Sequence, residues 1–173
     1  MHLETKRLTL RPFKADDLEA YLRVVSDEAV MKYIGACRAK NQKEAKQELT
    51  HWIDHQQRLG YSQWAIIEKS SQNLIGRAGL CELDSNPEIE VGYLLQQQSW
   101  GKGYATEVAQ ASIDFGITEL ELDNIYAVTR EDNKASQRVL EKCGLKKVGF
   151  RKYYNTQCVF FALDESKLPP LRS

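Results

Sequence analysis

The sequence has little proline and no long apolar run. Its 173 residues include four prolines and no stretch of about 18 consecutive apolar residues, so we expect no membrane-spanning helix. The first residues alternate charged and apolar side chains and lack the apolar core of a signal peptide, which favours a cytoplasmic protein. No CxxC pair occurs, and we expect reduced thiols at the four cysteines, Cys37, Cys81, Cys143 and Cys158.

The sequence also lacks an excess of either charge. Lys and Arg number 24, and so do Asp and Glu. This balance argues against nucleic acid or an anionic membrane as a partner, but it allows a local basic pocket for a phosphorylated small molecule. There is no internal repeat or low-complexity segment, and 42% of the residues are hydrophobic. We therefore expect one domain over residues 1–173, as a monomer or a homodimer.

The periodicity of apolar residues predicts a mixed α/β fold with about four helices and one mostly antiparallel sheet. We expect Asp16 to cap the first helix, and further helices at about 43–59, 104–117 and 133–144. The expected strands are 7–11, 62–68, 74–83, 89–95, 125–129, 146–154 and 157–163. Short links between the three strands in residues 62–95 favour an antiparallel meander.

A glycine-containing loop joins a predicted strand to a predicted helix at Gln98–Ala105. Helix N-termini carry backbone N–H groups without partners, and Gly101 and Gly103 let a phosphate approach them closely. Lys102 adds a positive charge. A Rossmann dinucleotide site is an alternative, but Thr106 replaces the third glycine and the preceding strands form a meander. A tight turn without a ligand is the other alternative.

Three groups of residues, in chain order, resemble the GNAT superfamily of N-acetyltransferases. The segment Gln98-Ser99-Trp100-Gly101-Lys102-Gly103 resembles the pyrophosphate signature of that family. The later helix motif of the family is matched by Asn133, Ser136, Gly144 and Phe150. The chain also resembles one branch of the family, which acetylates ribosomal-protein alanine N-termini (RimJ/RimL-type). This resemblance lies in Glu4–Pro12, Asp16-Asp17 and Glu90-Val91-Gly92-Tyr93-Leu94.

The resemblance implies a GNAT fold, in which the central sheet is splayed in the middle. It also implies direct transfer of an acetyl group from acetyl-CoA to a primary amine in a ternary complex, without a metal. The implied acetyl-CoA contacts are Leu94, Leu95, Gln96, Gln98, Gly101, Lys102, Gly103, Tyr104, Ala105, Asn133 and Ser136. Backbone N–H groups of residues 94–96 would face the thioester. The predicted acceptor contacts are Tyr33 and Trp64.

Two side chains are candidates for moving protons. Glu90 is the predicted base, acting directly or through water, and its alternative role is an exposed strand carboxylate. Ser136 is the predicted donor to the departing CoA thiolate, and its alternative role is a small packing residue. Many branches of the family have a tyrosine acid four residues after this serine, where Leu140 stands here. The sequence therefore leaves the general acid undecided.

The acceptor is expected to be the α-amine of a protein or peptide. Such an amine has a pKa of roughly 7.7–8.0, against about 10.4 for lysine, and so needs only a modest base. The alternatives are acetylation of a small amine, such as a polyamine or aminoglycoside, and a non-catalytic acyl-CoA-binding protein. His51 and His55 have the spacing of a zinc helix, but Trp52 stands at the glutamate position, so we expect a solvated helix face.

Overall fold

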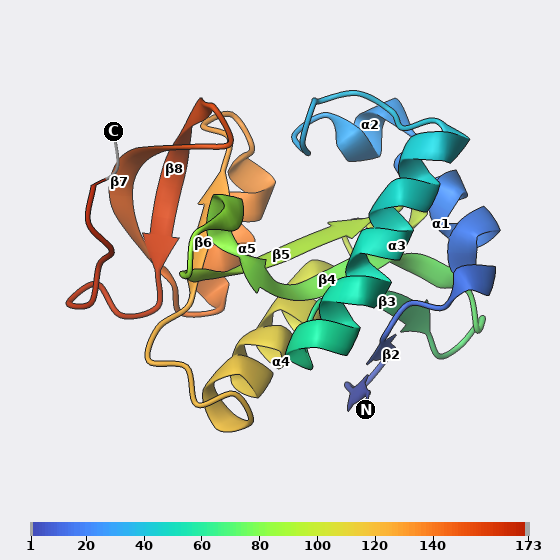
Figure 1. Ribbon diagram of the computed structural model, residues 1–173, viewed down its shortest axis with the longest axis horizontal. Helices are drawn as coiled ribbons and strands as arrows, with labels where there is room; N and C mark the ends of the chain where they lie inside the picture. The colour runs from blue at the N-terminus through green and yellow to red at the C-terminus, as the bar shows by residue number, and fades with distance from the viewer. Residues whose placement is uncertain (1, 172–173) are drawn as a thin grey trace.

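The computed structural model describes residues 2–171 and contains one eight-stranded sheet with the order β1-β2-β3-β4-β5-β6-β8-β7 (Figure 1). The strands are β1 Leu3–Glu4, β2 Leu8–Arg11, β3 Gln63–Glu68, β4 Leu74–Glu82, β5 Ile89–Leu95, β6 Tyr126–Thr129, β7 Lys146–Tyr153 and β8 Thr156–Ala162. All neighbours pair antiparallel except β5 and β6, which are parallel. The predicted mixed fold and the β3-β4-β5 meander are confirmed.

Helices cover both faces of the sheet. In residues 2–171 they are α1 Leu18–Val25, α2 Glu28–Met31, α3 Gln42–Leu59, α4 Tyr104–Thr118 and α5 Lys134–Lys142. One face, here called the α3 face, packs against α1 and α3, and Figure 1 shows α3 crossing in front of the sheet. The opposite face, the α4 face, packs against α4 and α5. None of the helices in the described residues has the length and apolarity that crossing a membrane requires.

The local sequence explains the limits of α3. Asn41 caps the helix by accepting a hydrogen bond from the Glu44 N–H at 2.9 Å, and the Glu44 carboxylate accepts from the Asn41 N–H at 2.9 Å. Gly60 ends the helix with a φ of +78°, a left-handed conformation that favours glycine. Because caps and the apolar stripe agree, the helix predicted at 43–59 is confirmed within one residue.

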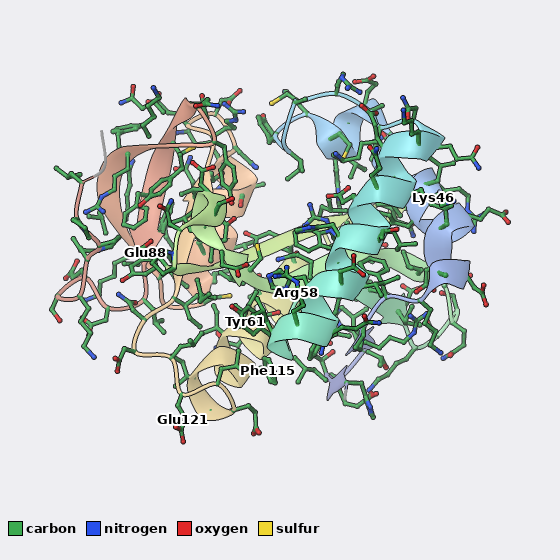
Figure 2. The ribbon with its side chains drawn as sticks, in the orientation of Figure 1. Lys46, Arg58, Tyr61, Glu88, Phe115 and Glu121 are labelled. Atoms are coloured by element: carbon green, nitrogen blue, oxygen red, sulfur yellow. The ribbon has the colours of Figure 1, made fainter. Side chains whose placement is uncertain are left out.

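His55 is not on a solvated face, so that expectation is wrong. Its side chain is 2% exposed, because this face of α3 lies against the ends of β3 and β4. Its Nδ1 is 2.8 Å from the carbonyl oxygen of Tyr61, which follows α3 near Arg58 (Figure 2), and its Nε2 is 2.6 Å from the Glu82 carboxylate. Across residues 2–171, no group of three or more His, Cys, Asp or Glu side chains is arranged to hold a metal ion.

The start of the first helix differs from the prediction. A 3₁₀ turn at Ala15–Asp17, η1, precedes α1, and Asp17 rather than Asp16 stabilises it by accepting from the Lys14 N–H at 2.8 Å. The Arg11 guanidinium also binds the Asp17 carboxylate with two bonds of 2.8 Å, which favours this carboxylate over its neighbour. The short elements α2 and β1 are missing from the prediction.

Strands β5 and β6 separate after a single register pair, Glu90↔Tyr126. Beyond it, β5 continues to Leu95 beside β4, whereas β6 continues to Thr129 beside β8. The predicted splay in the middle of the sheet is thus confirmed. It opens toward the loop that begins α4, and the chain crosses from β5 to β6 through α4 on the α4 face.

Candidate active site

The loop between β5 and α4 brings open backbone to the start of a helix. After the 3₁₀ turn η3, Gln97–Ser99, the chain passes through Gly101 and Gly103, whose φ angles are +72° and +81°. Gly103 is the N-cap of α4 and has no side chain to bond the first N–H groups of the helix. The loop therefore presents partial positive charge and N–H groups to an approaching phosphate.

Arg7 and Tyr104 fix this loop to the first strands. The Arg7 guanidinium pairs with the Glu107 carboxylate at 2.7 Å and donates to the Lys102 carbonyl at 2.8 Å. It also lies 4.5 Å from the centre of the Tyr104 ring, whose hydroxyl donates to Glu68 at 2.9 Å. Among the predicted acetyl-CoA contacts, Tyr104 is buried and Ala105 half-buried, whereas the exposed ones are Gln98, Gly101, Lys102 and Gly103.

Alternate residues of β5 direct their N–H groups to opposite edges of the strand. The Gln96 N–H donates to the Ile75 carbonyl of β4 at 2.8 Å. By the alternation of an antiparallel ladder, Leu94 also faces β4, whereas Tyr93 and Leu95 direct their N–H groups into the splay. Of the three residues predicted to present backbone N–H groups, Leu95 is thus the one that faces the opening. The sequence did not single out Tyr93 for this position.

Ser136 lies at the start of α5, beside the splay. Asn133 caps this helix and accepts from the Ser136 N–H at 3.2 Å. The hydroxyl of Tyr93 reaches across from β5, 2.9 Å from Ser136 Oγ, and donates to the Ser136 carbonyl at 3.2 Å. Burial raises the pKa of Tyr93, so this phenol stays protonated. Leu140, at the position of the family's tyrosine acid, is 1% exposed and belongs to the core.

Glu90 lies on the α3 face at the point where the splay begins. The Tyr154 hydroxyl, from the turn between β7 and β8, donates to Glu90 Oε1, and Cys81 Sγ is 3.8 Å from the same oxygen. Burial raises the pKa of Glu90 to about 7, although the hydrogen bond from Tyr154 and the charge of Arg77 act to lower it. A carboxylate with a pKa near neutral pH is a candidate for general acid–base chemistry.

A row of polar side chains extends from Glu90 beneath α1 and α3. Arg77 is 8% exposed and donates to the Tyr21 hydroxyl at 3.0 Å and to Gln63 Oε1 at 2.9 Å. Its charge is balanced by the Glu48 carboxylate of α3 at 3.3 Å. Gln63 in turn approaches Gly92 of β5, where a Cβ would lie 3.2 Å from its Nε2. The α3 face beside the splay is therefore polar at Arg77, Gln63 and Glu90.

The two predicted acceptor contacts lie in different environments. Trp64 is 2% exposed, packs against Phe115 and donates to Gln56, so it belongs to the core and we withdraw it as a groove residue. The sequence pattern misleads here because the first four residues of β3 are all buried, on both faces. Tyr33 follows α2 and is half-buried, with the Lys32 ammonium 5.0 Å from its ring. It stays a prediction.

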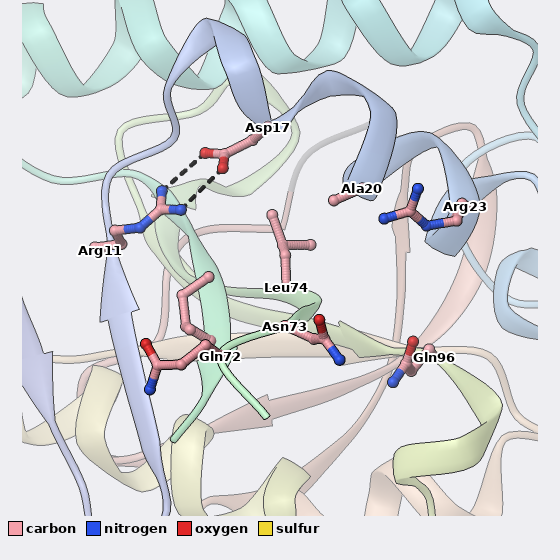
Figure 3. Close-up of a pocket in the computed structure, with 9 residues that line it drawn as sticks. Arg11, Asp17, Ala20, Arg23, Gln72, Asn73, Leu74 and Gln96 are labelled. Atoms are coloured by element: carbon pink, nitrogen blue, oxygen red, sulfur yellow. Dashed lines mark hydrogen bonds and ion pairs between the residues drawn. The ribbon is translucent and has the colours of Figure 1, made fainter. Parts of the chain in front are cut away.

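A cavity of about 350 Å³ lies on the α1 side of the sheet and borders this site only through Gln96 (Figure 3). Its other walls come from β2, η1, α1, and from the adjoining ends of β3 and β4 with the turn between them. The Arg11 guanidinium in its wall is already neutralised by Asp17. Since the candidate base and the helix N-terminus lie elsewhere, we place the chemistry at the splay and not in this cavity.

Comparison with known proteins agrees with this geometry. The family model of the acetyltransferase (GNAT) domain matches residues 7–146. The uncharacterised N-acetyltransferase p20 of Bacillus licheniformis is 31% identical over 153 residues, which are 88% of this chain and 86% of that protein. The structure of a GNAT-family acetyltransferase from Bacillus anthracis matches with a TM-score of 0.82 and 26% identity, over 96% of this chain and 100% of that one.

A further solved structure contains coenzyme A. The ribosomal L7/L12 α-N-protein acetyltransferase RimL, in complex with coenzyme A, matches with a TM-score of 0.79 and 18% identity, over 94% of this chain and 97% of that one. Members of the matched family use acetyl-CoA, and the open helix N-terminus after β5 suits the phosphates of that molecule. Because the family model matches most of its length, this chain belongs to the GNAT family of N-acetyltransferases.

Proposed function

We propose that this enzyme transfers the acetyl group of acetyl-CoA to the α-amino group of a protein or peptide N-terminus. The observation that carries the proposal is the place of Glu90, a carboxylate with a pKa near 7 at the mouth of the splay. A base of this strength suits an amine with a pKa of roughly 7.7–8.0. The RimL neighbour, by its name an α-N-protein acetyltransferase, supports the same acceptor.

Acetyl-CoA supplies a thioester whose carbonyl oxygen gains negative charge as the amine attacks. The N-terminus of α4 would hold the pyrophosphate, with Gly101 and Gly103 leaving the backbone accessible. The N–H of Leu95, directed into the splay, would stabilise the developing negative charge, and one such donor is worth about 3 kcal/mol. The N–H of Tyr93 faces the same opening and is the second candidate donor.

The two proton transfers are assigned to opposite faces of the sheet. Glu90 removes a proton from the amine on the α3 face. Ser136, at the start of α5, donates its proton to the CoA sulfur on the α4 face. Tyr93 holds the Ser136 hydroxyl in place through the 2.9 Å contact. Leu140 has no polar side-chain atom and could not orient this hydroxyl. The splay between β5 and β6 lets the acetyl group lie between these two faces.

The acceptor class is tested by a competition between two peptides at pH 7.5. One has a free α-amine and no lysine, and the other is the same peptide with a blocked N-terminus and one lysine. The α-amine should react on the order of 10²-fold faster, because far more of it is neutral at this pH. The measurement is the mass of each acetylated product. A preference for the lysine peptide, or for spermidine added as a third competitor, would contradict the proposed acceptor.

A further inference from the structure

The hydroxyl of Tyr154 donates a hydrogen bond to the Glu90 carboxylate. Tyr154 belongs to the β7–β8 turn and therefore reaches Glu90 from the other half of the splayed sheet. Two further bonds hold it in place: its N–H donates to Asp84 Oδ2 at 2.8 Å, and its hydroxyl oxygen accepts from the Asp84 N–H at 3.0 Å. The side chain is 45% exposed, so a solute can reach it.

The hydrogen bonds of this hydroxyl leave room for one more donor. A phenol has one O–H and two acceptor lone pairs. The O–H donates to Glu90, and one lone pair accepts from the Asp84 N–H. These two bonds leave the second lone pair for a further donor. An attacking amine is such a donor.

We propose that Tyr154 is a further catalytic residue, which relays the proton of the acceptor amine to Glu90. The inference rests on the proposed function, because it takes Glu90 as the base. It replaces direct or water-mediated contact between the amine and Glu90 by a route through a side chain that the structure shows in place. Tyr153, the neighbour of Tyr154 in the chain, is 5% exposed and belongs to the core, whereas Tyr154 is exposed.

The relay balances in protons and bonds. As the amine nitrogen bonds to the acetyl carbon, an N–H bond breaks and its proton passes to the Tyr154 oxygen. The O–H of Tyr154 breaks at the same time, and its proton passes to Glu90 Oε1. The carbon–sulfur bond breaks, and the sulfur takes a proton from Ser136. Water then returns a proton to the Ser136 oxygen, and Glu90 releases its own proton to water. Burial and the nearby Glu90 charge raise the pKa of Tyr154, which keeps the phenol protonated between turnovers.

The charged and titratable groups around Glu90 determine how its pKa should shift in each variant. They are Arg77 and Cys81 of β4, Asp84 of η2 (Leu83–Ser85), Tyr154 of the turn and Cys158 of β8. The Tyr154 hydrogen bond lowers the pKa of Glu90, and the charge of Asp84 raises it. Tyr154→Phe should therefore raise the pKa of Glu90, and Asp84→Asn should lower it.

The experiment combines turnover with direct titration of the carboxylate. In Tyr154→Phe we expect kcat with an α-amine peptide to fall about 10²-fold and acetyl-CoA affinity to stay unchanged. The pKa of Glu90, followed by NMR of ¹³C-labelled glutamate side chains, should rise above its wild-type value near 7. Asp84→Asn is the matched control: it removes the charge and keeps the Tyr154 hydroxyl in place, and it should shift the pKa downward with a smaller loss of kcat.

Each outcome separates the relay from the proposed function. An unchanged pKa of Glu90 in Tyr154→Phe would show that the contact is absent in solution and would overturn the inference. A raised pKa with wild-type kcat would show that the amine bypasses the hydroxyl, and the relay would be wrong while Glu90 remained the base. If the wild-type enzyme acetylated no amine at all, the proposed function itself would fail, whatever the NMR titration showed.

Discussion

Replacing Glu90 with glutamine should lower kcat about 10²–10⁴-fold, the usual range for loss of a general base, with acetyl-CoA affinity unchanged. The amide keeps the shape of the side chain and its place under Tyr154, but it cannot take a proton. The N-terminus of α4 lies on the other face of the sheet, so the affinity for acetyl-CoA should not change. The rate is measured by release of the CoA thiol, and the affinity by calorimetry.

The matched control is Glu82→Gln, on the neighbouring strand. Glu82 pairs with the buried His55, away from the splay, so its loss should lower stability and leave kcat near the wild-type value. Wild-type turnover in Glu90→Gln would contradict the assignment, because it would show that the amine loses its proton without help from this carboxylate. An equal loss in both variants would indicate a general effect of the removed charge.

Replacing Gly103 with alanine should weaken acetyl-CoA binding by about 2 kcal/mol, or about 30-fold. The added methyl group would stand at the N-cap of α4, where the pyrophosphate must approach the backbone. Inside the free protein the methyl group has space, since its nearest neighbour would be Arg7 Nη2 at 3.4 Å. Calorimetric titration with acetyl-CoA measures the change.

Gly60→Ala separates the loss of binding from backbone strain. Gly60 has a φ of +78°, close to the +81° of Gly103, and a Cβ there would meet nothing within 4 Å. Both variants should lose about 1–2 kcal/mol of folding free energy because alanine is strained in the left-handed region. Only the variant in the loop should lose acetyl-CoA affinity. Unchanged affinity in a folded Gly103→Ala protein would rule out this binding geometry.

Long elements with strong local signals were predictable from the sequence. For α3, the apolar stripe and Gly60 agree, and the helix lies where the pattern placed it. The two-residue β1 and the four-residue α2 are too short to show a hydrophobic period, so the sequence did not predict them. Asp16 and Asp17 are equally good caps by type, and only the tertiary contact with Arg11 selects Asp17.

The glycine loop that leads into α4 was predictable because its glycines and the helix start are adjacent in the chain. The contacts of the two tyrosines near the splay could not be predicted. Tyr93 meets Ser136 across 43 residues, and Tyr154 meets Glu90 across 64, so no local spacing reveals either contact. Burial raises the pKa of Glu90, and this burial is a property of the folded chain that no local sequence pattern shows. The sequence alone therefore leaves both roles of Glu90 open, a candidate base or an exposed strand carboxylate.

The most direct test of the account is the pH dependence of kcat in the wild-type enzyme and in Glu90→Gln, with a saturating α-amine peptide. Because the pKa of Glu90 is raised to about 7, its basic form increases as the pH rises through 7, and wild-type kcat should rise with it. The kcat of the Glu90→Gln variant should not rise in this way near pH 7. The same rise in both proteins would contradict the central claim that Glu90 accepts the proton of the amine.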